Sequence, residues 1–260
     1  IEVEWGYGTI LDSRDINEHD FNMSWWAWSG ALAAEVEPAL SAKEYAERFG
    51  EVIGDPFALD YSLEGIYSEH MARTVYWHRH YVMSWKHSAI LCDWRFANIV
   101  DAKGPDFRGL TPWAEPAFFE AVTGIKLSFE DGLEIGRRIW NLQRAIHVLQ
   151  GRTREHDQFT LGPRSYIYNV PAEGGSANVF APAYENGEWV WKYVRENPPL
   201  SYERVEAWKD KYYRLEGWDV ATGWPTRETL EALGLGYVAD ELAAKGKLPS
   251  RKQRISRVVR

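Results

Sequence analysis

The densest group of ionisable side chains in the sequence lies in the run RDINEHD at residues 14–20. Arg14, Glu18 and His19 are the candidate catalytic residues of this run. A histidine titrates near neutral pH, so with a carboxylate and a guanidinium beside it His19 can act as an acid or a base. The alternative interpretation of the run is an exposed polar loop.

Cys92 is the single cysteine of the chain. One cysteine cannot form an internal disulfide, which fits a reducing compartment. Its thiolate is a soft donor that suits iron, whereas a buried lone thiol is normally inert. Ser84 and Ser88 precede Cys92 at spacings of four, which predicts that the three side chains share one face of a helix. The two hydroxyls would then line the approach to the sulfur.

Histidines recur along the segment before Cys92, at positions 70, 78, 80 and 87. No two of them have the i, i+4 spacing of a helical zinc site. We therefore predict packed histidines that hydrogen-bond to Tyr or Asp rather than a dedicated metal site. The sequence also contains no Gly-rich phosphate loop and no GxSxG turn.

Helices are the elements that must position these residues. Ser41 and Glu44 form a capping-box pattern that begins a helix running to about Phe49. The segment from about Leu63 to Val100 lacks proline and shows helical spacing, which predicts one long helix or two abutting ones. Residues 1–40 are rich in Gly and Trp and are expected to form loops and short turns.

In the second half of the chain, Ser128 and Asp131 begin an amphipathic helix that ends at about Gln150, before Gly151. Its expected buried stripe is Ile135, Ile139, Leu142, Ile146 and Leu149. Shorter helices are predicted at about 115–122, 202–215, 226–233 and 238–245.

Two runs with period-two alternation, SYIYNV at 165–170 and EWVWKYV at 188–194, can pair as a small β-hairpin. The predicted fold class is therefore mainly α, irregularly packed and multihelical, with a small hairpin near 165–194. The predicted domains are a helical portion at 1–110 with the candidate loop and cysteine, a helical domain at 111–250, and a basic tail at 251–260.

Composition narrows the classes of function. A net charge of −8 disfavours general binding to nucleic acid, which depends on neutralising phosphates. The tail at 251–260 is the exception, since five of its ten residues are Lys or Arg, and such a run is either solvated or bound to an acidic partner. No apolar run approaches the roughly 20 residues that span a bilayer, and no signal peptide is visible. A cytoplasmic location is therefore expected.

Aromatic residues are abundant, with 14 Trp, 14 Tyr and 10 Phe in 260 residues. They indicate either a large aromatic core or a wall around a large flat ligand. In the second case the Trp-rich segments 24–28 and 76–94 would shape an apolar substrate tunnel.

Two stretches near the carboxyl terminus resemble one known family. The stretch from Lys211 to Leu248, KYYRLEGWDVATGWPTRETLEALGLGYVADELAAKGKL, is similar to the ending typical of the aldehyde:ferredoxin oxidoreductase family. GRRIWNLQRAIHVLQGRTREHD at 136–157 resembles the long helix that precedes that ending in the family. The run LGLGYVADEL at 233–242 looks most like the tungsten subunit of class II benzoyl-CoA reductases, which belong to the same family.

The resemblance implies the carboxy-terminal, helical portion of an enzyme with two cofactors, a tungsten bis-pyranopterin (molybdopterin) and a [4Fe–4S] cluster. Cys92 stands where the family has a fourth cluster thiolate. His87 stands where the family has an Asp that binds the pterin, and it can offer one acceptor nitrogen in place of a carboxylate. Arg14 and His19 are the nearest equivalent of the family's Arg-Gly-x-x-His loop, although the Gly is absent and the spacing is one residue longer.

The implied activity is oxidation of an aldehyde to a carboxylic acid with ferredoxin, or another electron-transfer subunit, as the acceptor. An alternative within the family is reduction of an aromatic acyl-CoA. In both cases an amino-terminal pterin domain would be the partner of this chain, which would not be active alone. The competing class is a non-catalytic, diverged or truncated scaffold subunit.

Overall fold

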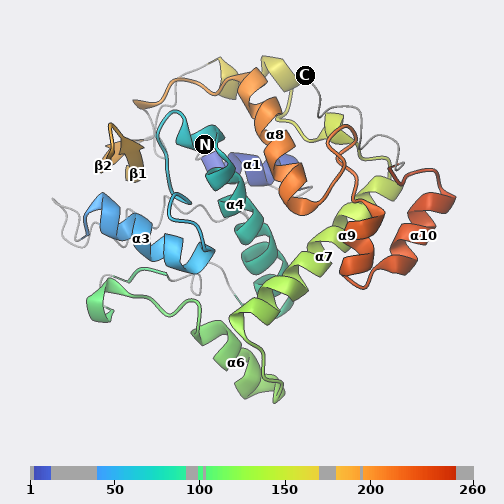
Figure 1. Ribbon diagram of the computed structural model, residues 1–260, viewed down its shortest axis with the longest axis horizontal. Helices are drawn as coiled ribbons and strands as arrows, with labels where there is room; N and C mark the ends of the chain where they lie inside the picture. Colours follow the sequence, from blue (N-terminus) through green and yellow to red (C-terminus); the bar gives the residue numbers. More distant parts are fainter. Residues whose placement is uncertain are drawn as a thin grey trace.

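The computed structural model describes residues 3–12, 40–91, 99–101, 104–169, 180–193 and 196–249. Helices dominate these residues, as predicted (Figure 1). At the centre, α4 (Glu69–Trp77) continues into η3, a π-helix at His78–Lys86. α7 (Phe129–Leu149) packs along η3, and α8 (Tyr202–Glu216) packs along α4. These packed helices hold most of the site described below.

Shorter elements surround this centre. α1 (Val3–Leu11) packs against α4, while α6 (Ala114–Thr123) packs against α7 and projects from the body of the molecule (Figure 1). α3 (Ala42–Ile53) covers the hairpin of β1 (Phe180–Glu185) and β2 (Glu188–Tyr193). α9 (Arg227–Ala232) and α10 (Gly236–Ala244) pack together beside α7. Short 3-10 turns occupy 65–67, 105–107, 154–156, 162–164 and 166–168.

The helix starts predicted from capping residues are confirmed. The Ser41 hydroxyl accepts from the backbone N–H of Glu44 at the start of α3, and Ser128 does the same for Asp131 at the start of α7. Gly217 ends α8 in the left-handed conformation, with φ of 74°. These boundaries follow from local chemistry. At the start of a helix a side-chain oxygen accepts from a free backbone N–H, and at its end a residue with positive φ turns the chain so that the following N–H groups bond the last free carbonyls.

Two predictions about the amino-terminal half are wrong in part. Residues 3–11 are helical rather than loop, and Tyr7, Ile10 and Leu11 lie in the core. The long helix begins only at Glu69, where the Ser68 hydroxyl accepts from the Met71 N–H at 3.1 Å. It ends before Ile90, whose φ of 61° is incompatible with a continuing helix.

The predicted apolar stripe of α7 is also wrong. Ile135, Ile146 and Leu149 are exposed, at 37%, 47% and 37%. The buried face is instead Gly132, Gly136, Trp140, Asn141, Arg144, Ala145 and Val148. Polar side chains can occupy this face because each of them finds a buried partner, as described below.

The hairpin is confirmed, but its first strand is not SYIYNV. Tyr166–Tyr168 is a 3-10 turn, and the partner of β2 is β1, with Glu185 opposite Glu188. Asn186 and Gly187 form the two-residue loop with φ of 54° and 90°. Asn-Gly is the preferred pair for such a loop because both residues tolerate positive φ.

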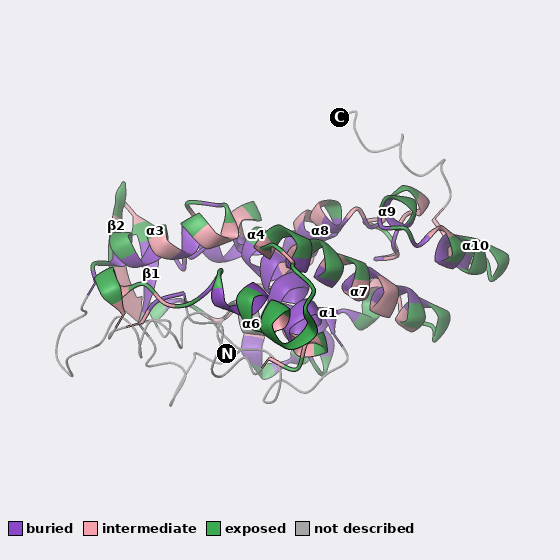
Figure 2. Cartoon of the chain, turned by 90° about the horizontal axis from the view of Figure 1, so that it is seen from below, coloured by how far each residue is buried: buried purple, intermediate pink, exposed green. Residues whose placement is uncertain are grey.

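One large cluster of buried hydrophobic residues, rich in Trp and Tyr, fills the centre (Figure 2). Trp85, Trp140 and Trp208 are among its fully buried members. The interpretation of the aromatics as a large core is therefore confirmed for these residues. Within the part of the chain that the structure describes, no helix is long and apolar enough to cross a membrane.

Candidate functional site

The π-helix η3 is the most unusual element of the described structure. All nine of its residues are buried, including His78, Arg79, His80, Ser84 and Lys86. π-Helical turns are rare and often occur at functional sites. The Ser84 hydroxyl donates to the Arg79 carbonyl at 2.8 Å, five residues earlier. A polar, buried π-helix directly before Cys92 makes this region the candidate functional site.

Two glycines of α7 allow the π-helix to approach closely. A Cβ atom on Gly136 would lie 1.8 Å from the His80 carbonyl oxygen. A Cβ atom on Gly132 would lie 3.0 Å from the ring of Trp85. Because no side chain fits at Gly136, the backbones of α7 and η3 are in direct contact there.

Arg79 connects the π-helix to the end of α1. Its guanidinium donates to the Asp12 carboxylate at 3.0 Å, and the two side chains are 0% and 2% exposed. Gln143 of α7 donates to the other oxygen of Asp12 at 2.9 Å. Gly8 makes room for Arg79, since a Cβ at Gly8 would lie 1.8 Å from the guanidinium. Asp12 therefore joins three helices immediately before the candidate catalytic run 14–20.

His80 begins a buried chain of hydrogen bonds. Its Nε2 lies 2.9 and 3.1 Å from the two carboxylate oxygens of Glu216, at the end of α8. The Tyr212 hydroxyl donates to Glu216 at 2.6 Å, and the Trp140 indole donates to Tyr212 at 3.1 Å. The ring of Tyr76 packs edge-on against His80, with centroids 3.9 Å apart. The imidazole is thus fixed by groups from three helices.

A second set of buried polar residues comprises His78 and Lys86 of the π-helix and Glu115 of α6. Burial lowers the pKa of His78 well below its usual value, and the charges of Arg79 and Lys86 lower it further. Burial raises the pKa of Glu115 in α6, although a hydrogen bond from Thr111 and the charge of Lys86 oppose that rise. His78 is therefore neutral near pH 7, and its Nε2 has no partner among the described residues.

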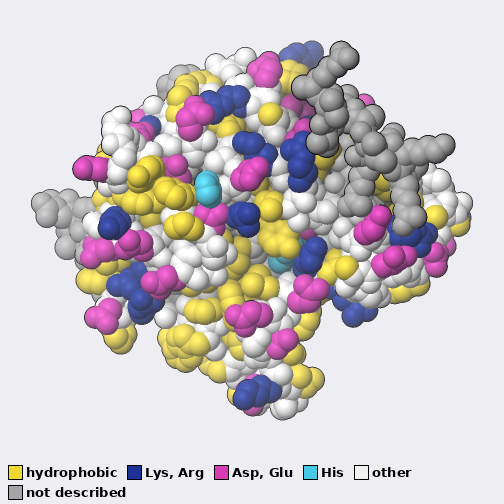
Figure 3. Space-filling view, viewed as in Figure 1, with side chains coloured by type: hydrophobic (Ala, Val, Ile, Leu, Met, Phe, Trp, Pro, Cys, Tyr) yellow, Lys and Arg dark blue, Asp and Glu magenta, His cyan; other side chains and the backbone are white. Residues whose placement is uncertain are grey.

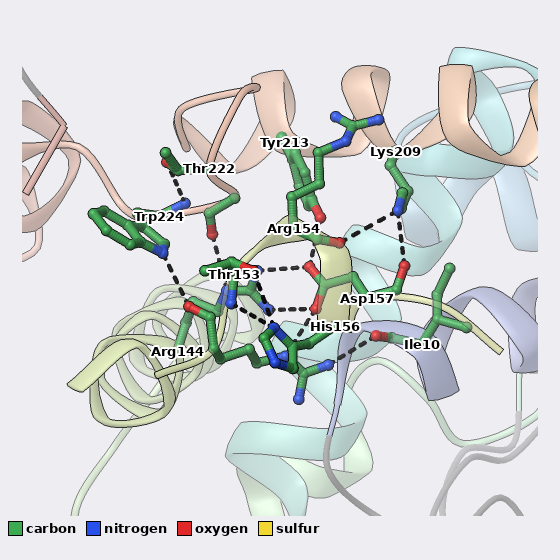
Figure 4. Close-up of polar contacts among 12 residues, drawn as sticks. Ile10, Arg144, Thr153, Arg154, His156, Asp157, Lys209, Tyr213, Thr222 and Trp224 are labelled. Atoms are coloured by element: carbon green, nitrogen blue, oxygen red, sulfur yellow. Dashed lines mark hydrogen bonds and ion pairs between the residues drawn. The ribbon is translucent and has the colours of Figure 1, made fainter. Parts of the chain in front are cut away.

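Asp157 lies at the centre of the network in Figure 4. Arg144 binds its carboxylate through two hydrogen bonds of 2.9 and 2.6 Å, and Arg152 adds a third of 2.8 Å. The Tyr213 hydroxyl donates to Asp157, and Lys209 donates to its backbone carbonyl at 2.8 Å. Burial favours the neutral carboxyl, but Arg144 and its neighbours outweigh burial and hold the pKa of Asp157 below its usual value.

The same network fixes the loop between α8 and α9. Arg144 donates to the Gly223 carbonyl at 2.9 Å and lies 4.7 Å from the centroid of the Trp218 ring. The Trp224 indole donates to the Arg152 carbonyl at 2.9 Å (Figure 4). The residues that carry the family resemblance in both stretches are therefore partners in one buried scaffold.

Of the residues predicted for the site, the structure places only His87. It is half-buried and follows the π-helix directly. Arg14, Glu18, His19 and Cys92 lie outside the described residues. Ser84 and Ser88 do not share a face, since Ser84 is buried and Ser88 is exposed. Both hydroxyls donate to backbone carbonyls of their own segment, Ser84 to Arg79 five residues earlier and Ser88 to Trp85 three residues earlier.

The prediction that the histidines hydrogen-bond to Tyr or Asp is confirmed for His70, whereas His80 pairs with a Glu and the Nε2 of His78 has no partner among the described residues. His70 hydrogen-bonds to Asp55 at 2.8 Å, as predicted for Tyr or Asp partners. The pairing of His80 with Glu216 was not predicted, because the two residues are 136 positions apart. The only local signal for it was the density of polar residues in HRHYVMSWKH at 78–87, within an otherwise helical segment.

The described residues can be tested as a metal centre. They contain no group of three or more His, Cys, Asp and Glu side chains that could hold a metal ion. The one cysteine of the chain can supply one of the four thiolates of an iron–sulfur cluster. The described residues therefore do not form a complete metal centre by themselves.

Among solved structures, the chain is similar to a chain of the active-site complex BamBC of benzoyl coenzyme A reductase, in complex with 1,5-dienoyl-CoA. The sequence identity is 27% over 52% of this chain, with a TM-score of 0.34. The match covers 16% of the length of that chain. The family model for "Aldehyde ferredoxin oxidoreductase, domains 2 & 3" matches residues 32–235, and the chain belongs to this oxidoreductase family.

Proposed function

We propose that this chain forms domains 2 and 3 of a tungsten-dependent oxidoreductase that oxidises an aldehyde to a carboxylic acid. The observation that carries the proposal is the family match over 32–235, which spans Cys92, all of the stretch 136–157 and the second stretch as far as Leu235. A bound tungsten bis-pyranopterin would supply the two-electron chemistry, and a [4Fe–4S] cluster would pass electrons to ferredoxin. An amino-terminal pterin domain would complete the enzyme.

In this proposal the chain's own residues have three tasks. Cys92 supplies one thiolate to the cluster, and His87 offers a ring nitrogen that accepts a hydrogen bond from the pterin. His19, with Arg14 and Glu18 beside it, moves protons at the reacting carbonyl. The π-helix, with its contacts to Asp12, Glu216 and α7, holds the segment that leads to Cys92. Precise positioning of this kind is what the protein contributes when a cofactor performs the redox step.

The first experiment is elemental analysis of the native protein purified anaerobically, with intact mass to establish its length. The proposal predicts tungsten and about four irons per chain, together with aldehyde oxidation coupled to ferredoxin reduction. Cys92→Ala should lose the cluster's spectroscopic signal, whereas Ser88→Ala, a matched change of a nearby exposed side chain, should retain it. Absence of metal from the native protein would contradict the proposal and favour the scaffold subunit.

A second candidate function within the family is reduction of an aromatic acyl-CoA. The observation that favours it is the sequence LGLGYVADEL at 233–242, which follows α9 directly and includes most of α10. The metal analysis does not separate the two activities. Two parallel assays separate them, one with an aldehyde and one with an aromatic acyl-CoA plus a low-potential reductant. Each activity consumes only its own substrate.

A further inference from the structure

A cleft of about 350 Å³ opens among α4, the start of η3, α7 and the ends of α3 and α8. Its volume lies at the small end of the range for ligand sites. Ile53, Leu133 and Leu215 give it an apolar wall. Figure 3 shows hydrophobic side chains exposed over the region of α4, α7 and α8, with acidic and basic side chains around them.

Two buried donors of the cleft have no acceptor in the described part of the chain. Trp77 lines the cleft and is 3% exposed, and its indole Nε1 is unpaired. Arg137 lines it from α7, and its buried Nε is also unpaired. Both groups can only donate. Buried polar groups are nearly always hydrogen-bonded, so two unpaired donors on one cleft indicate an acceptor that occupies it.

Tyr76 and His80 also line the cleft. Burial, followed by the charge of Glu216, raises the pKa of Tyr76 to about 12, so its hydroxyl stays protonated and can donate. Glu216 itself is fully buried and already accepts from His80 and Tyr212. The lining of the cleft therefore offers a ligand donors from Trp77, Tyr76 and Arg137.

The acidic residues of the cleft lie toward solvent. Glu130 is exposed, and the side chain of Glu134 is 60% exposed. Glu134 approaches Arg137 only to 3.9 Å. Such an exposed pair is weak because water screens it, so an incoming anion can replace Glu134 as the partner of Arg137.

We propose that this cleft binds a small monocarboxylate with an apolar body. The carboxylate accepts from Trp77 and Arg137, and the body packs against Ile53, Leu133 and Leu215. Charge-assisted hydrogen bonds from a guanidinium to a carboxylate supply both affinity and orientation. This site uses neither Cys92 nor His19, and it does not depend on the proposed function.

The test compares three probes of nearly equal shape by calorimetry on the purified full chain. Phenylacetate carries the carboxylate, phenylacetamide is neutral, and phenethylamine is a cation. We expect phenylacetate to bind about tenfold more tightly than the amide, as one charge-assisted hydrogen bond implies, and the amine not to bind. Trp77→Phe keeps the ring but removes the N–H, and Arg137→Gln removes the charge.

Each variant should weaken phenylacetate binding about tenfold, and Arg137→Gln should weaken amide binding less, because the neutral amide loses no charge-assisted bond. Arg227→Gln is the matched control, because Arg227 forms ion pairs with Glu231 and Asp240 in the α9–α10 region, among residues that do not line the cleft. If Trp77→Phe fails to fold, Arg137→Gln decides alone. Equal affinity for acid and amide, unchanged binding in the variants, or a crystal structure grown with phenylacetate that shows only water in the cleft would each overturn the proposal.

Discussion

The guanidinium of Arg79 lies 3.0 Å from the carboxylate of Asp12, with both side chains inaccessible to solvent. This ion pair joins the end of α1 to the π-helix, across 67 positions of sequence. Asp12 is the last described residue before the candidate run 14–20, and the π-helix leads toward Cys92. One buried pair thus joins described residues that precede, in the sequence, each of the two segments on which the proposed chemistry depends.

Asp12→Asn is expected to lower the free energy of unfolding by about 3 kcal/mol. The substitution keeps the shape of the side chain but leaves the buried charge of Arg79 without a counter-charge. Denaturant unfolding followed by near-UV circular dichroism measures the change. Glu51→Gln, which removes the exposed partner of Arg108, is the control and should have little effect. Equal effects of the two substitutions would show that the buried pair contributes no more to the free energy of unfolding than the exposed pair does.

Asp157→Asn tests the network that holds α7, α8 and the 217–226 loop together. The pKa of Asp157 is lowered in the folded state, so its stabilising contribution is present above the unfolded pKa and is lost as pH falls through the folded pKa. We expect a loss of about 3 kcal/mol at pH 7. The difference between the wild type and the variant should shrink as the pH falls below about 4. A difference that stays constant from pH 7 to pH 3 would refute this linkage.

His78 predicts a loss of stability in acid as well, but in a higher pH range than Asp157. Burial lowers its pKa well below the usual value, so below about pH 6.5 the unfolded chain binds a proton that the folded chain does not. Stability should therefore fall as the pH drops from 7 to 5. His78→Leu should flatten this part of the stability profile, whatever its effect at pH 7. His156→Gln, at an exposed turn, is the control and should leave the slope unchanged.

Local signals in the sequence were sufficient for much of the helical architecture. Ser41, Ser128 and Gly217 determine helix ends through contacts within a few residues, so their effect can be predicted from spacing alone. The hairpin loop at Asn186 and Gly187 has the same local origin.

The buried face of α7 could not be predicted by the same means. Hydrophobic periodicity assigns isoleucines to the core, but Arg144 is buried there because Asp157 pairs with it. Asn141 is buried because it accepts from the Trp218 indole at 2.7 Å. Such pairings join distant parts of the chain, and no local pattern reveals them. The same limit applies to the site. The sequence draws attention to His80, but no local pattern predicts that Glu216 is its partner.

Gly136→Ala tests whether contact between α7 and the π-helix maintains the site. The added Cβ would lie 1.8 Å from the His80 carbonyl oxygen, so the two helices must separate. We expect a loss of about 3 kcal/mol or more, in the range of overpacked cores, with a change in the near-UV spectrum of the aromatic core. Gly236→Ala is the matched control, since its Cβ would meet only Glu231 at 3.8 Å. If Gly136→Ala were as stable as Gly236→Ala, the close approach of the two backbones would not be what holds the π-helix in place.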